Sequence, residues 1–342
     1  MPLGKATDQA LANPTSLSYV FIFGLLVLVA FLGLATPLVT VLFASFALHK
    51  LDRFRRKWVA VTLFAVLVLA IFYGFAHFTR HAIIAVPKIA ETSIPKIIEY
   101  AKAHGFDLPF EDIDSLKALI VDTVKDQLKS VTNFARVATK QFLFVIIGIV
   151  VAVSLFLNPK LDLDQDSIRP KNDLYAVLCR ELAVRFGLLF RSFTLVMGGQ
   201  LIISAINTVL TAIFVLSISL PYALIVIGIT FLAGLIPIVG GLLSNTLIVG
   251  IAFTKSPSLA VAALVFLVVL HKLEYFLNSR IIGHRIRNPV WLTLLALILG
   301  ERLMGVPGMI LAPVILHYLK VEASQFQLDP VPNQPPQPAI SD

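Results

Sequence analysis

Ionisable and amide side chains inside the apolar segments are the residues of this chain with the greatest chemical potential. Glu274 ends one apolar run, with His271 and Lys272 beside it. A carboxylate inside a bilayer costs about 2.5–3.5 kcal/mol on insertion scales, so it persists only where it is paired or protonated. A carboxyl with a shifted pKa can exchange a proton for a cation. The alternative interpretation places Glu274 at the headgroup level.

Three amides offer uncharged hydrogen bonds in similar surroundings. Gln200 and Asn207 stand seven residues apart in one apolar run, and Asn245 lies in another. Seven residues make about two helical turns, so the first two share a helix face. Such amides bind polar cargo, or they bond neighbouring membrane helices to each other. Both interpretations stay open.

The apolar segment 221–253 is too long for one straight crossing. Its middle reads GLIPIVGGLLSN, from Gly234 to Asn245, and contains Pro237, Gly240 and Gly241. A broken helix leaves backbone N–H and C=O groups free to bind ions or polar cargo, which is how many transporters build a midplane site. We therefore expect a break here that contributes to a transport pathway. The alternative is a kinked structural helix.

A second overlong segment, 289–319, is interrupted at Leu299–Gly308, where it reads LGERLMGVPG. We expect a hairpin with both ends on the cytoplasmic side and its tip near Gly300–Gly305, because basic residues flank both ends. That tip would bring Glu301 and Arg302 close to the first break. The alternative is one tilted span.

Catalytic and cofactor signatures are missing from the sequence. It has no G-x-x-x-x-G-K-[ST], no G-x-S-x-G and no H-E-x-x-H. Its single cysteine, Cys179, excludes an internal disulfide and a cysteine-based metal site. We expect a protein that is not an enzyme, has no cofactor or metal, and is not driven by ATP.

Composition defines the protein class that must position these residues. The 342 residues are 58% hydrophobic and 14% charged, with a mean hydropathy of +0.88. Soluble domains are about 45–50% apolar and roughly 25% charged. We predict an all-α polytopic membrane protein with about eight membrane helical segments, some broken or re-entrant, plus a small helical extracytoplasmic region. The net charge of +8 lies in short loops that set topology, so no nucleic-acid partner is expected.

The N-terminal membrane helices begin with two apolar runs, 19–34 and 38–48. Thr36-Pro37 is expected to separate them as a hairpin, although one long kinked helix is the alternative. The basic segment 49–57 is expected to be cytoplasmic, so the span 58–79 leads outward.

The region 80–140 is polar and is segmented by Pro87, Pro95 and Pro109. Apolar residues recur at helical spacing over 112–135, and this helix is expected to continue into the span 141–157. Its stripe either belongs to a solvated linker helix or packs against other copies of the chain, which predicts a homo-oligomer.

After that span, an amphipathic helix at 172–191 is expected to lie on the cytoplasmic surface before the span 193–217. The expected organisation has five parts: a cytoplasmic segment 1–16, membrane helices 17–79, the extracytoplasmic region 80–140, a transport core 141–320 and a disordered Pro-rich tail 321–342.

The C-terminal half resembles the autoinducer-2 exporter family of bacterial transporters. The resemblance is carried by the Gly199-Gln200 pair and by four longer motifs: LPYALIVIGITFLAGLIPIVGGLL (220–243), HKLEYFLNSRIIGHRI (271–286), NPVWLTLLALILG (288–300) and GVPGMILAPV (305–314). It implies a multi-pass protein of the bacterial inner membrane, with both termini expected in the cytoplasm.

The resemblance implies a secondary transporter, because members are described as exporters of a small signalling molecule and some as sodium/proton antiporters. The leading hypothesis is an exporter of a small polar molecule that works by alternating access at the broken helices. The alternatives are a sodium or lithium/proton antiporter that uses Glu274, and a membrane scaffold without transport activity. The expected pathway residues are Glu274, Pro237, Gly240, Gly241, Asn245, Gln200, Asn207, Glu301 and Arg302.

Overall fold

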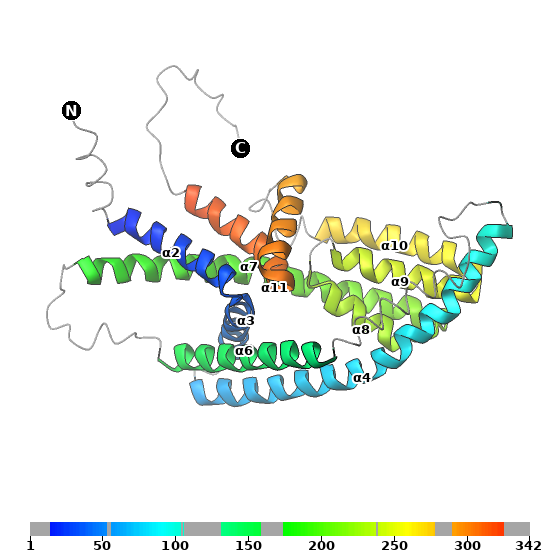
Figure 1. The fold of residues 1–342 in the computed structure, drawn as a ribbon, viewed down its shortest axis with the longest axis horizontal. Coiled ribbons are helices and arrows are strands. Elements are labelled where there is room, and N and C mark those ends of the chain that lie inside the picture. The colour runs from blue at the N-terminus through cyan, green and yellow to red at the C-terminus, as the bar shows by residue number, and fades with distance from the viewer. Residues whose placement is uncertain are drawn as a thin grey trace, which may run out of the picture.

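The computed structural model describes residues 14–52, 56–103, 105, 131–158, 174–236, 239–277 and 289–324. These residues form α-helices joined by turns, with no β-strand among them (Figure 1). Five of the helices are long and apolar enough to cross a membrane, or six when the bent N-terminal pair is included. The expected all-α polytopic architecture is confirmed, and the expected count of eight segments is approximate.

Two N-terminal helices, α2 (Pro14–Phe31) and α3 (Ala35–Leu51), are bent by 116° relative to each other. The break lies at residues 32–34 and not at Thr36-Pro37 as expected. Gly33 turns the chain with φ of +66°, a conformation that glycine adopts without steric cost. Pro37 instead lies in the first turn of α3, where a missing N–H removes no intrahelical bond.

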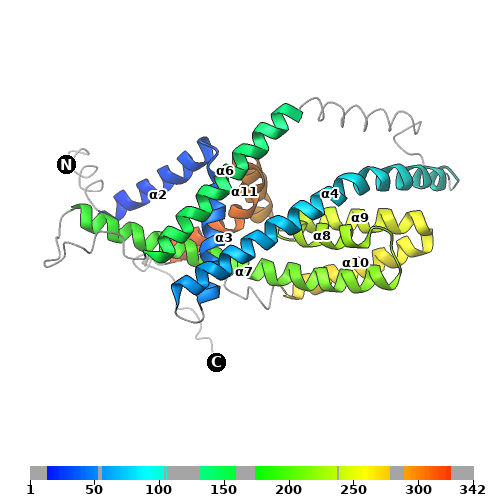
Figure 2. The same cartoon turned by 90° about the horizontal axis from the view of Figure 1, so that it is seen from below.

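Helix α4 (Lys57–Ala103) is a single helix of 47 residues. It continues through Pro87 and Pro95, so the expectation that these prolines divide the polar region was wrong for this part. Figure 1 shows that α4 curves along its length, and proline is a common cause of bending in long helices. Its distal half lies along α8 and α9 (Figure 2). Ala85 enters their apolar core, and Lys96 donates to the Thr254 carbonyl of α9 at 2.7 Å.

Helix α6 (Val131–Leu157) lies across α3 at close range. A side chain at Gly148 would come within 2.7 Å of Thr40 Cβ, so glycine permits this crossing. The helix is already formed at Val131 and ends at Leu157, so the span expected at 141–157 extends toward its N-terminus without a break. The rest of the apolar stripe at 112–135 lies outside the described residues.

Helix α7 (Leu174–Ser217) joins two elements that were expected to be separate. The amphipathic segment 172–191 and the span 193–217 form one continuous helix, because no glycine pair or proline separates them. The boundary expected near Ser192 is therefore wrong. Its N-terminal half packs against α2 and α11, and Arg185 is only 4% exposed.

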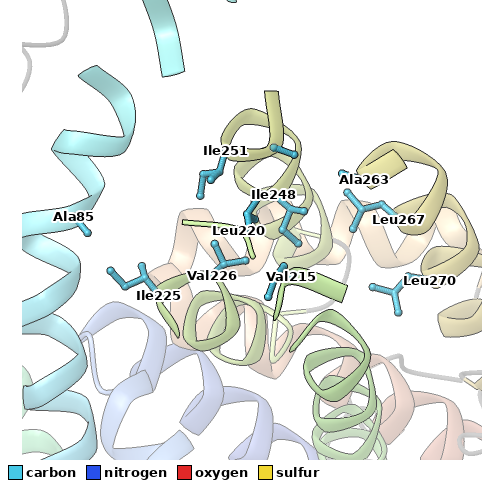
Figure 3. Packing of buried hydrophobic residues seen from close by; sticks show 11 residues of the cluster. Ala85, Val215, Leu220, Ile225, Val226, Ile248, Ile251, Ala263, Leu267 and Leu270 are labelled. Atoms are coloured by element: carbon cyan, nitrogen blue, oxygen red, sulfur yellow. The ribbon is translucent and has the colours of Figure 1, made fainter. Parts of the chain in front are cut away.

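A four-helix bundle is built from the end of α7, α8 (Ala223–Ala233), α9 (Val239–Lys255) and α10 (Pro257–Leu277). The break expected in 221–253 is confirmed, because α8 ends before Gly234 and α9 begins at Val239. Figure 3 shows the apolar core that the four helices share with Ala85 of α4. The labelled core residues include Val215 of α7, Val226 of α8, Ile248 of α9 and Leu267 of α10, and they hold the broken pair between two unbroken helices.

Helix α11 (Val290–Ser324) reverses direction at Gly305, whose φ and ψ are 64° and −149°. In Figure 1 its two arms diverge on the same side of this point. The backbones of Gly300 and Gly308 are so close that a Cβ on Gly308 would lie 2.0 Å from the Gly300 carbonyl oxygen. The reversal expected within 289–319 is therefore present, with its tip inside the expected range. The position of the hairpin relative to the two sides of the membrane stays a prediction.

Candidate functional site

A cavity opens beside the α8–α9 break, between α7, α8, α9 and α10. The space inside it that a water molecule can enter is about 20 Å³, which is room for about one water in this conformation. Its walls combine polar groups with the aliphatic side chains of α10. The lining residues are Gln200, Asn207, Thr230, Gly234, Ile236, Gly241, Ser244, Asn245, Leu267, Leu270, His271 and Glu274.

The structure brings together five of the nine residues that the sequence indicated. These are Gln200, Asn207, Gly241, Asn245 and Glu274, which come from three different helices. They stand on α7, α9 and α10, so the three signals that were recognised separately in the sequence converge on one cavity.

The other four residues have different positions. Gly240 is buried beside the cavity in the first turn of α9 without lining it. Pro237 lies outside the described residues. Glu301 and Arg302 are exposed near the α11 tip and line no part of this cavity. The expectation that the second break would bring these two charges to the first one is therefore wrong, because α11 packs against α2, α3 and α7.

Glu274 is oriented by α7. The Asn207 side-chain N–H donates to Glu274 Oε2 at 3.2 Å, across the gap between α7 and α10. Asn207 Oδ1 is buried and has no hydrogen-bond partner. An unpaired buried acceptor loses its hydration without compensation, which makes it a point where a hydrogen-bond donor would be favoured.

Two side chains of α7 also bond the broken end of α8. Gln200 Nε2 donates to the Gly234 carbonyl at 2.6 Å, and Ser204 Oγ donates to the Phe231 carbonyl at 2.8 Å. The last carbonyls of a helix have no partner within the helix, so these bonds satisfy groups that the break leaves free.

The two halves of the break meet closely. A Cβ on Gly240 would lie 1.7 Å from the Ala233 carbonyl oxygen, so only glycine allows the first turn of α9 to pack on the end of α8. The negative end of the α8 dipole and the positive end of the α9 dipole therefore lie side by side, and their fields oppose each other. The sign of the potential in the cavity then depends mainly on its ionisable side chains.

Three polar lining residues were missed by the sequence reasoning as pathway residues: Thr230, Ser244 and His271. Thr230 and Ser244 lie within one or two turns of the break, and that proximity was the available signal. His271 stands three residues before Glu274, so the two share a helix face. It was interpreted only as evidence for a headgroup position.

Comparison with known proteins agrees with this architecture. The sequence model described as "AI-2E family transporter" matches residues 16–325. The chain is also 26% identical over 274 residues to a protein of Bacillus subtilis (strain 168) named "Putative transport protein YdbI", with 78% of this chain and 76% of that protein covered. The match to the family model spans both N-terminal helices, the cavity and the α11 hairpin, and the chain therefore belongs to the AI-2E family of membrane transporters.

Proposed function

We propose that this protein is a secondary transporter that moves a small polar molecule out of the cell through the cavity beside the α8–α9 break. The observation that carries the proposal is the convergence of Gln200, Asn207 and Glu274 on that cavity. Irregular backbone is tolerated inside a membrane only where protein or water covers it. A polar cavity at such a break is the arrangement that alternating access requires.

The lining groups favour a cargo that donates hydrogen bonds. The hydroxyls of Thr230 and Ser244 donate to the carbonyls of Val226 and Gly240, which leaves their oxygens as acceptors. Asn207 Oδ1 and the Glu274 carboxylate add further acceptors. No lysine or arginine occurs among the described residues that line the cavity. A polyol, an amine or a monovalent cation therefore fits better than a phosphate or a carboxylate.

Uptake into inside-out vesicles tests the exporter proposal. Inside-out vesicles that contain the protein are incubated with radiolabelled polyols, amines and organic acids, with and without a proton gradient. Uptake of a polyol or amine, but not of an organic acid, is expected. Leu242 is exposed outside the cavity, so Leu242→Ala serves as a control that retains uptake, whereas Asn207→Leu is expected to abolish it. Uptake of organic acids alone would contradict the proposed cargo class.

An antiporter of sodium or lithium against protons is the second candidate, because one carboxyl, Glu274, lies in the cavity next to the unpaired Asn207 Oδ1. A carboxyl that alternates between a proton and a metal cation is sufficient for such an exchange. Glu274→Gln keeps the shape but cannot be ionised, so it is expected to abolish pH-coupled sodium or lithium flux in proteoliposomes.

The matched control for that substitution is Glu301→Gln, which neutralises an exposed carboxyl outside the cavity and is expected to retain the flux. Persistent flux in Glu274→Gln would exclude the antiporter in this form. The scaffold hypothesis would have gained from unbroken helices at both interruptions, and both interruptions are broken. We further propose that the chain resides in the bacterial inner membrane with both termini in the cytoplasm.

A further inference from the structure

The carbonyl groups at the end of α8 accept hydrogen bonds from two kinds of donor, backbone N–H groups and side chains of α7. Those of Thr230, Leu232 and Ala233 accept N–H groups from Gly234, Leu235 and Ile236, as in an ordinary helix end.

The two remaining carbonyls, of Phe231 and Gly234, accept from Ser204 and Gln200 of α7. Buried backbone groups are almost always paired. The closed break therefore depends on α7 for two of its five terminal carbonyls.

Geometry makes this pairing specific. Gln200 and Ser204 stand four residues apart, so they project from one face of α7. Both are buried, with exposed fractions of 6% and 1%. A Cβ on Gly234 would come within 2.6 Å of Ser204 Oγ, so glycine at this position allows α7 to approach.

We infer that Gln200 and Ser204 are positioning residues that act as a latch, holding the α8–α9 break against α7 in this conformation. The inference rests on the proposed transport function. Ser204 and Phe231 do not line the cavity, whereas Gln200 and Gly234 do. Ser204 is therefore the enclosed half of the latch, and Gln200 is the half that cargo can reach.

Opening the latch changes the chemistry of the cavity. Release of Gln200 would leave the Gly234 carbonyl without a donor, beside the acceptors of Asn207 and Glu274. A cargo that donates hydrogen bonds would replace the Gln200 amide there. Cargo binding and release of the break are then the same event, which gives the transporter a means of moving only when it is loaded.

A cysteine reporter tests the latch without measuring flux. Gly241 lines the cavity, and a Cβ there meets no atom within 4 Å, so Gly241→Cys fits the structure. Cys179 is replaced by serine to remove the other thiol. The purified full-length protein is treated with a small cationic methanethiosulfonate, and the rate of modification is measured.

Gln200→Met preserves the side-chain volume but removes the hydrogen-bond donor. The modification rate is expected to rise about threefold to tenfold, because the loss of one hydrogen bond raises the population of the open conformation by about that factor. Ser204→Ala is expected to raise it by a similar factor. Thr208→Ala is the control and leaves the rate unchanged, because its hydroxyl donates to Ser204 O within α7 and contacts no other helix through that bond.

Equal rates in the parent, Gln200→Met and Ser204→Ala proteins would overturn the latch. If Gln200→Met does not yield monodisperse protein, Gln200→Glu and Ser204→Ala carry the comparison. Failure of the transport assays with accelerated labelling would refute the cargo proposal and leave the latch standing. Normal transport with unchanged labelling would refute the latch and leave the cargo proposal standing.

Discussion

The Tyr19 hydroxyl donates to Glu322 Oε1 at 2.8 Å, joining residues that lie 303 positions apart in the sequence. The Arg185 guanidinium covers the Tyr19 ring at 4.1 Å, contacts Glu322 Oε1 at 3.6 Å and pairs with Glu181 at 2.8 Å. These four side chains connect α2, α7 and α11. The N-terminal and C-terminal helices are therefore fixed to the same end of α7.

Loss of Arg185 should destabilise the protein strongly. Arg185→Met would leave the carboxylate of Glu322, which is also buried, without its cation, and breaking such a pair costs about 3–5 kcal/mol. An apparent Tm in detergent lower by about 5–10 °C is expected from light scattering or from intrinsic fluorescence. Arg191→Met on the exposed face of α7 is the control. Equal Tm values for the two variants would show that the cluster contributes little.

Two adjacent glycines of α9 should respond differently to alanine. Gly240→Ala would place a methyl group 1.7 Å from the Ala233 carbonyl oxygen, so the two halves of the break must separate. Overpacking of this kind costs about 1–3 kcal/mol or more. Gly241→Ala meets no atom within 4 Å. Thermal stability should fall in the first variant and stay at the parental value in the second, and equal stability would refute the close contact.

The α11 hairpin predicts that both of its ends lie on one side of the membrane. Cysteines introduced at Trp291, which is exposed at the start of the first arm, and at Ser341 in the tail should be modified from the same side. The measurement uses a membrane-impermeant thiol reagent on intact cells and on inside-out vesicles after replacement of Cys179. Modification of the two positions from opposite sides would mean that α11 crosses the membrane completely.

Homo-oligomerisation is predicted to depend on residues 106–130. A deletion that began at residue 80 would also remove Ala85 from the bundle core and the bond from Lys96 to α9. Replacement of only 106–130 by a short Gly/Ser linker should therefore lower the assembly mass in detergent, as measured by multi-angle light scattering, while preserving the bundle. An unchanged mass would place the oligomer contacts in the membrane helices.

The sequence located the α8–α9 break and the α11 reversal because glycine acts locally, whereas it placed the N-terminal break at Thr36-Pro37 and the structure places it at Gly33. Gly240 and Gly305 interrupt long apolar runs, and the reversals occur beside them. Helix boundaries inferred from a change of polarity were less reliable. Ser192 keeps its backbone N–H, and Pro87 removes only one bond from the hydrogen-bond ladder, so α7 and α4 continue through these positions.

Only the structure shows which of the polar residues lie together in one cavity. Gln200, Asn207 and Glu274 could be selected one by one as polar groups in apolar helices. The bond from Ser204 to Phe231 could not be anticipated, because serine in a membrane helix usually donates to its own backbone and the distance along the chain carries no information about pairing. Glu301 and Arg302 were expected near the first break, but their position depends on how α11 packs, which the sequence does not reveal.

Helix α7 is continuous over its whole length of about 66 Å. Near one end it carries Arg185, which is tied to both ends of the described chain, and farther along it carries Gln200, Ser204 and Asn207, which hold α8 and α10. Because α7 is one continuous helix, a rotation of the whole helix moves both groups of side chains together. A rotation that withdraws the α7 side chains from the cavity would therefore also move Arg185 relative to Tyr19 and Glu322, so the contacts of α2 and α11 with α7 would change together with the cavity.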